Sequence, residues 1–193
     1  KTFYSSFHIA LFDAYHSMNI KIFRFSIPFR SNLIINNIEG IIHTSIAIDS
    51  YGGEVYSLLH MVSEIESSSL PIMTIAQGKA MSCGAVLLSY GFEGMRYCAP
   101  SATIMIHDVS SMDFGKVEEL KAGAAEADRL NKKIYTMMAR NCGKKDDYFM
   151  KIVDKKKHAD WFLEAEEAKK HGLANQLRVP SIRVSIDVDI DLE

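Results

Sequence analysis

Apolar and polar positions along the chain form patterns typical of strands in some segments and of helices in others. Short apolar or alternating runs predict strands over residues 20–27, 41–48, 72–76, 95–98 and 103–107. Apolar residues at helical spacing predict one helix that begins at residue 54 and others over residues 82–90, 116–141, 146–156 and 164–171. Since strands alternate with helices, the pattern predicts an α/β fold with a largely parallel sheet.

The two ends of the chain carry weaker signals. Ile9, Phe12 and Tyr15 are spaced for one face of a short N-terminal helix. A final strand is expected after Gly172. Residues 182–193 alternate apolar side chains with polar and acidic ones, which favours an edge strand and leaves a docking tail for a partner as the alternative.

Composition narrows the class of protein. The 193 residues, 48% hydrophobic and 24% charged, fit one soluble domain with a sizeable core. A net charge of −2 does not indicate the basic surface that nucleic acid binding requires. No apolar run approaches the roughly 20 residues that cross a bilayer. Three cysteines without a C-x-x-C pair argue against a disulfide framework or a zinc site. We therefore expect no metal, no nucleic acid and no membrane, and a cytoplasmic location or an organelle matrix.

The candidate chemistry is acyl transfer. Ser82 lies among small residues at a predicted strand-to-helix turn, and His107 ends a later apolar strand. A serine hydroxyl needs a base to take its proton as it attacks, and histidine suits this role near neutral pH. The pair Gly52-Gly53 follows an earlier strand and can expose backbone amides to a developing oxyanion. The pattern indicates a serine hydrolase, although Ser82 alone would more often be a helix cap.

A third member is needed to orient the histidine. Asp160 stands out because a charge interrupts an apolar run there, just before a predicted helix. Asp108 adjoins His107 but would point to the opposite face if the strand continued. Lys79, three positions before Ser82, offers a Ser-Lys dyad as a less favoured alternative.

Four segments together resemble the proteolytic subunit of the Clp protease family. They are DSYGG at 49–53, GKAMSCGA at 78–85, YCAP with IMIH within 97–107, and ADWFL with EEA and HGL within 159–173. The resemblance covers roughly residues 41–177. It implies that Ser82 is the nucleophile, His107 the general base and Asp160 the orienting acid. It also implies oxyanion donors at the backbone N–H groups of Gly53 and Cys83, with substrate lying along Gly52-Gly53.

The resemblance implies an architecture and partners as well. It predicts the Clp/crotonase fold, one ClpP-like peptidase domain over residues 1–193, and a handle helix at 116–141 that interlocks two rings. It implies a homo-oligomer of stacked heptameric rings that cleaves unfolded polypeptides. An AAA+ unfoldase would be the partner that uses ATP, and this chain itself would hold no cofactor.

The chain departs from the family pattern at several positions, and two alternative functions stay open. Tyr51 stands where the family has proline, and Asp49, Cys83 and the Asp108-Val109 pair also differ from the usual residues. Residues 1–40 do not match the family's N-terminal segment. A non-catalytic ring subunit is the first alternative, and an acyl-CoA enzyme of the crotonase type is the second.

Overall fold

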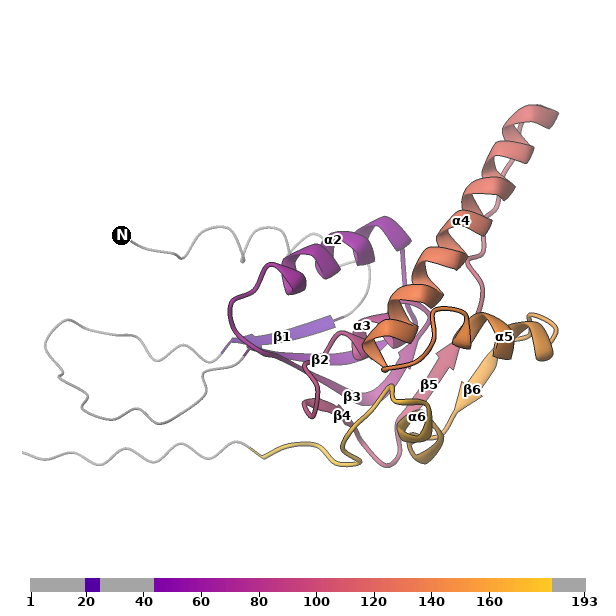
Figure 1. The fold of residues 1–193 in the computed structure, drawn as a ribbon. Coiled ribbons are helices and arrows are strands. Elements are labelled where there is room, and N and C mark those ends of the chain that lie inside the picture. Colours follow the sequence, from indigo (N-terminus) through magenta and orange to yellow (C-terminus); the bar gives the residue numbers. More distant parts are fainter. Residues whose placement is uncertain (1–19, 25–43, 182–193) are drawn as a thin grey trace, which may run out of the picture.

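The computed structural model describes residues 20–24 and 44–181, and this part of the chain contains one six-stranded sheet and five helices (Figure 1). The strands are β1 (Ile20–Arg24), β2 (Thr44–Ser50), β3 (Ile72–Met81), β4 (Arg96–Cys98), β5 (Thr103–Ile106) and β6 (Trp161–Leu163). The helices are α2 (Val55–Glu66), α3 (Cys83–Ser89), α4 (Val117–Asn141), α5 (Tyr148–Lys155) and α6 (Ala165–His171). The predicted α/β class is confirmed.

The middle of the sheet is parallel and its two edges are antiparallel. The strands lie in the order β1-β2-β3-β5-β6, and β4 also pairs with β3. β2, β4 and β5 each run parallel to β3, whereas β1 is antiparallel to β2 and β6 is antiparallel to β5. β2 is buried at six of its seven positions, as expected for a strand covered on both faces.

β3 is longer than its pattern predicts. The apolar run stops at Ala76, but the strand continues through Gln77, Gly78 and Lys79 to Met81. Its first half pairs with β4 and its second half with β5. The polar stretch hides the continuation in the sequence, because both Gln77 and Gly78 are exposed.

Helices pack on the sheet through apolar faces. In α2 the buried residues are Leu58, Met61, Val62 and Ile65, which follow helical spacing. The Glu54 carboxylate caps this helix by accepting hydrogen bonds from the backbone N–H groups of Tyr56 and Ser57, at 2.9 and 2.7 Å. Every residue of α3 is buried, which places this short helix in the centre of the core.

α4 has two different halves. Its C-terminal half buries Leu130, Ile134 and Met138 in the core, while its N-terminal half projects away from the sheet (Figure 1). Gly143, with φ of +63°, follows the C-cap residue Cys142 and ends the helix.

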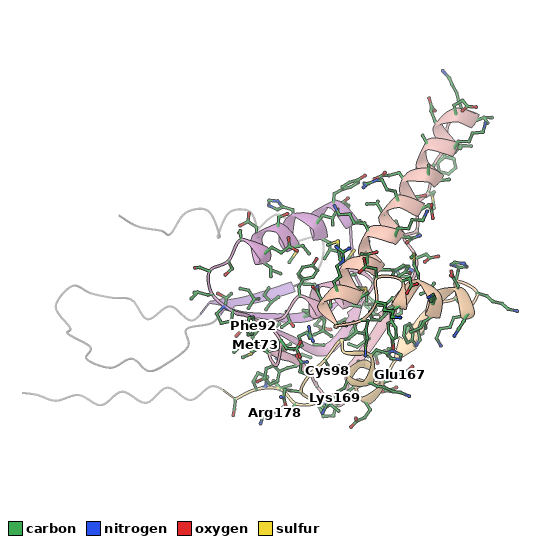
Figure 2. The ribbon with its side chains drawn as sticks, viewed as in Figure 1. Met73, Phe92, Cys98, Glu167, Lys169 and Arg178 are labelled. Atoms are coloured by element: carbon green, nitrogen blue, oxygen red, sulfur yellow. The ribbon has the colours of Figure 1, made fainter. Side chains whose placement is uncertain are left out.

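Figure 2 shows Lys169 of α6 and Arg178 at the side of the molecule away from the free end of α4.

The C-terminal part differs from the sequence pattern in two places. β6 was not predicted, because a three-residue strand is too short to show a period. The final strand expected after Gly172 is absent from residues 173–181, where Gln176 forms only an isolated bridge with Tyr97. The predicted N-terminal helix and the alternating residues 182–193 lie outside the described residues. The assignment of residues 1–193 to a single domain stays a prediction.

Candidate active site

Ser82 occupies a tight turn between β3 and α3, as predicted. Its backbone has φ of 54° and ψ of −121°, a conformation that L-residues rarely adopt. The backbone N–H of Ser82 donates a hydrogen bond of 2.8 Å to the carbonyl of Met105 in β5. The strand before the turn and the buried helix after it therefore hold Ser82 in a strained geometry.

The glycine turn after β2 lies directly against Ser82. Ser50 pairs with Ala80 at the end of the β2–β3 ladder, and this register carries the following residues toward the serine. A Cβ atom on Gly52 would lie 2.6 Å from the Ser82 Cβ and 3.0 Å from the Met81 carbonyl oxygen. Gly52 also has φ of +110°, so both its conformation and its surroundings require glycine.

Ser82 and His107 line the same cleft, which has a volume of about 240 Å³. Gly53 and Cys83 border it too, and Tyr51, with 76% of its surface exposed, lies beside them. Part of the apolar wall comes from two helices that pack into the core. These side chains are Val86 of α3 with Ile134 and Met138 of α4.

β6 brings Asp160 to His107. The antiparallel register pairs Ile106 with Trp161, and one further step sets His107 opposite Asp160. The His107 Nδ1 atom lies 3.8 Å from the Asp160 Oδ1 atom, an ion-pair distance that is longer than a hydrogen bond. The His107 side chain is 25% exposed and the Asp160 side chain 56%, so solvent reaches this contact.

The two alternative partners weighed from the sequence are engaged elsewhere. Asp108 accepts hydrogen bonds of 2.7 Å from the Tyr135 hydroxyl and from the His158 Nδ1 atom. The Lys79 Nζ atom lies 2.7 Å from Asp49, and this hydrogen bond raises the pKa of the ammonium group. A protonated lysine cannot take a proton from Ser82, so the structure does not favour a Ser-Lys dyad.

Cys83 connects the serine turn with the glycine turn. Its Sγ atom lies 3.2 Å from the carbonyl oxygen of Gly53, to which the thiol donates. Burial raises the pKa of the Cys83 thiol, so the group stays protonated near neutral pH. The thiol therefore holds the two turns together and is a poor nucleophile.

Three polar residues near the site were missed by the sequence analysis. Asn131 of α4 accepts a hydrogen bond of 2.7 Å from the Val109 backbone N–H, one turn away from Tyr135. His158 reaches Asp108 from the segment before β6. Asn131 and Tyr135 are polar residues four positions apart beside the buried face of α4, and that spacing was the available signal.

Within residues 20–24 and 44–181, no group of three or more His, Cys, Asp and Glu side chains is arranged to hold a metal ion. None of the helices in the described part of the chain is both long enough and apolar enough to cross a membrane.

Comparison with known proteins identifies relatives of the chain. The family model described as Clp protease matches residues 32–180. The ATP-dependent Clp protease proteolytic subunit 1 of Rhodopirellula baltica is 34% identical over 130 residues, which are 67% of this chain and 56% of that protein. Subunit 3 of Nocardia farcinica is 32% identical over 143 residues, covering 73% of this chain and 63% of the relative.

A third relative, the ATP-dependent Clp protease proteolytic subunit of Bacteroides fragilis, is 31% identical over 135 residues, 70% of this chain and 63% of that protein. The chain thus spans less than two thirds of the length of each of these curated relatives. The mixed sheet and its helices are consistent with the Clp/crotonase fold that the resemblance implied. The chain belongs to the Clp protease family.

Proposed function

We propose that the chain is a serine endopeptidase that cleaves unfolded polypeptides inside an oligomeric chamber. One observation carries the proposal: Ser82, in its strained turn, shares a cleft with His107, and β6 sets Asp160 opposite that histidine. These are the three groups that nucleophilic acyl transfer requires, and they come from distant parts of the chain.

The mechanism assigns one role to each side chain. His107 faces Asp160 through Nδ1, so its Nε2 atom is the one available to take the Ser82 proton. The Ser82 Oγ atom then attacks the peptide carbonyl, and the imidazolium returns the proton to the leaving amine as the C–N bond breaks. Water, activated by the same histidine, hydrolyses the acyl-enzyme and frees Ser82.

The oxyanion of each tetrahedral intermediate needs hydrogen-bond donors. We assign these to the backbone N–H groups of Gly53 and Cys83, because both residues border the cleft that Ser82 lines. The substrate would lie extended along Gly52-Gly53 as an added strand. Loss of one such donor should lower turnover about 100- to 1,000-fold.

A serine-directed fluorophosphonate tests the assignment. Wild type should be labelled at Ser82, as located by peptide mapping, and Ser82→Ala should not be labelled. Ser101→Ala removes an exposed serine outside the cleft and should label like wild type. Equal labelling of wild type and Ser82→Ala would refute the nucleophile. An unlabelled wild type that still assembles would favour the non-catalytic ring subunit, and coenzyme A binding would favour the crotonase-type enzyme.

The projecting half of α4 supports the proposed chamber. Large apolar side chains on it and on the loop before it are exposed to solvent. They are Met112 at 83%, Phe114 at 88%, Val117 at 65% and Leu120 at 41%. Exposed apolar groups of this size are typical of protein interfaces, which agrees with a handle helix that joins two stacked rings of seven.

Native mass measurement tests the stacking. Leu120→Glu places a charge in the proposed contact and should convert double rings into single rings. Lys121→Gln, at the next and more exposed position of α4, should leave the double ring intact. An unchanged mass for Leu120→Glu would contradict the handle assignment.

The names of the relatives state that those proteases depend on ATP. We assign ATP use to a separate AAA+ unfoldase, with no cofactor held by this chain. Cleavage of short peptides should then need no ATP, whereas degradation of a folded protein should need the unfoldase together with ATP. Peptide cleavage that stops on ATP removal in the purified chain would contradict this division.

A further inference from the structure

A second contact joins the segments that carry His107 and Asp160. The residue after His107 is Asp108, and its Oδ2 atom lies 2.7 Å from the Nδ1 atom of His158. His158 lies only two positions before Asp160 in the chain. The same two segments are therefore connected twice, by a contact of 3.8 Å between His107 and Asp160 and by a much shorter one beside it.

The His158 side chain reaches Asp108 from an unusual backbone conformation. His158 has φ of +60° and Lys157 φ of +56°, and two consecutive non-glycine residues in the left-handed region are costly. The His158 backbone N–H donates to the Val153 carbonyl at 3.0 Å, which ends α5. Together with the imidazole hydrogen bond to Asp108, this backbone hydrogen bond fixes the turn that immediately precedes Asp160.

α4 fixes the other side of the contact. The Tyr135 hydroxyl donates to the Oδ1 atom of Asp108 at 2.7 Å, and Tyr135 itself is buried. Burial and the adjacent Asp108 carboxylate raise the pKa of Tyr135, so the phenol keeps the proton that it donates. At the next residue of the chain, the Val109 backbone N–H donates a hydrogen bond to the Asn131 side chain of α4. The segment that follows His107 is thus attached to a packed helix.

The groups around His158 favour its role as a donor. The Asp154 Oδ1 atom of α5 lies 3.6 Å from the His158 Nε2 atom, and the Asp108 Oδ2 atom lies 2.7 Å from the His158 Nδ1 atom. With a carboxylate on each nitrogen, both the Nδ1–H tautomer and the imidazolium can donate to Asp108.

We propose that Asp108 and His158 are a pair of positioning residues that sets the distance between His107 and Asp160. The inference rests on the proposed function, since it concerns the base and acid of that same site. Neither residue acts on the substrate itself. Both contacts are partly exposed, with the His158 side chain at 60% and the Asp160 side chain at 56%, so the difference between them is distance. The His107–Asp160 contact of 3.8 Å is longer than a hydrogen bond, whereas the Asp108–His158 contact of 2.7 Å is a hydrogen bond and supplies the alignment.

Substitutions at His158 separate the side chain from the backbone. His158→Gly suits the left-handed conformation and removes the donor, whereas His158→Asn also tolerates it and carries an amide N–H near the Nδ1 position. We expect kcat for a short peptide, and the rate of phosphonate labelling at Ser82, to fall about 10-fold in His158→Gly with KM nearly unchanged. His158→Asn should recover most of this loss, which a purely structural role would not predict.

Two further variants test the same contact. Tyr135→Phe keeps the buried ring and loses only the hydroxyl that donates to Asp108, so a smaller loss of kcat is expected. Asp108→Asn combined with His158→Gly should lose no more activity than the worse single variant, because both act through one contact. Additive losses, or a His158→Gly enzyme as fast as wild type, would overturn the proposal.

Hydrogen–deuterium exchange separates this inference from the proposed function. If wild type is not labelled at Ser82, the proposed function fails, yet exchange still reports on the contact. Amides of residues 159–163 should exchange faster in His158→Gly than in wild type and should be protected again in His158→Asn. Unchanged exchange in His158→Gly would refute the positioning role independently of activity.

Discussion

The two halves of the candidate active site are built differently. Ser82 and Gly52 are fixed by backbone: a strand register, a buried helix and a glycine turn so close to Ser82 that a Cβ atom on Gly52 would lie 2.6 Å from the Ser82 Cβ. His107 and Asp160 meet through side chains, at 3.8 Å and partly in solvent. The nucleophile half is therefore held by packed backbone, whereas small movements of the segment before β6 would change the alignment of the acid–base half.

This difference indicates which contacts can change the proposed activity without disturbing the fold. A change that moves α3 must disturb the core, because α3 is buried at every position. A change in the acid–base half alters side-chain contacts between β5 and β6 and leaves the core in place. The contrast between the two halves leads to four predictions, of which the first has the largest expected effect.

Gly52→Ala should abolish most activity. The new Cβ would collide with the Ser82 Cβ at 2.6 Å, so the glycine turn must move away from the nucleophile. We expect kcat for a short peptide to fall about 100- to 1,000-fold, the effect of losing an oxyanion donor. Gly94→Ala is the matched control, because Gly94 also has a positive φ, +85°, but a Cβ atom there would meet nothing within 4 Å beyond its chain neighbours. A Gly52→Ala enzyme with normal kcat would show that the nucleophile half is not rigid.

Asp160→Asn should have a smaller effect. The carboxylate is 56% exposed and lies 3.8 Å from the imidazole, so water can replace part of its contribution. We expect kcat to fall about 10- to 100-fold, less than the loss of about 10⁴-fold known for a buried acid in a serine protease. Asp128→Asn, an exposed carboxylate on α4, should leave kcat unchanged. A loss as large as that of Ser82→Ala would contradict the adjustable character of this half.

The packing behind β6 should make stability depend on pH. His171 contacts the Trp161 ring at 4.8 Å and the Tyr148 hydroxyl at 2.9 Å, and burial lowers the pKa of His171. The unfolded chain binds this proton more readily than the folded protein. The stabilising contribution of neutral His171 is therefore complete above the unfolded-state pKa of about 6.5 and is lost as the pH falls below it.

Melting temperatures at pH 7.5 and pH 5.5 measure this effect. Wild type should lose more stability on acidification than His171→Gln, which cannot titrate. Equal losses in the two proteins would show that protonation of His171 does not loosen the support of β6.

Thiol reagents should have the smallest effect. All three cysteines are buried, and burial raises the pKa of Cys98 and of Cys142 to about 11. Iodoacetamide at pH 8 should therefore modify the native protein slowly and leave peptide cleavage unaffected, whereas protein unfolded in guanidinium should react at all three sites. Rapid inhibition traced to Cys83 would indicate that the turn at Ser82 opens to solvent.

Sequence patterns predicted one half of the site better than the other. Ser82, Gly52 and His107 each lie within two residues of the end of a strand, and parallel strands gather such residues at one edge of a sheet. Asp160 could be singled out only as a charge in an apolar run. Its pairing with His107 depends on the antiparallel register of a strand of three residues, which no periodicity reveals.

The Asp108–His158 contact could not have been predicted, for a related reason. Asp108 was expected to point away because strand alternation was extended past Ile106, where β5 in fact ends. The chain then leaves the strand, and the direction of Asp108 is decided by Tyr135 on a helix 27 positions later. Contacts made by loops after a strand end depend on tertiary packing, and local sequence contains little information about them.

At Ser82 the residue that the proposed reaction requires differs from the residue that would best stabilise the turn. Glycine would adopt φ of 54° without steric cost, so a Ser82→Gly protein is expected to be at least as resistant to heat as wild type while unable to form an acyl-enzyme. Wherever catalysis no longer matters, selection for stability would favour such a replacement. A descendant chain that no longer needs Ser82 for chemistry would therefore gain robustness from glycine at this turn.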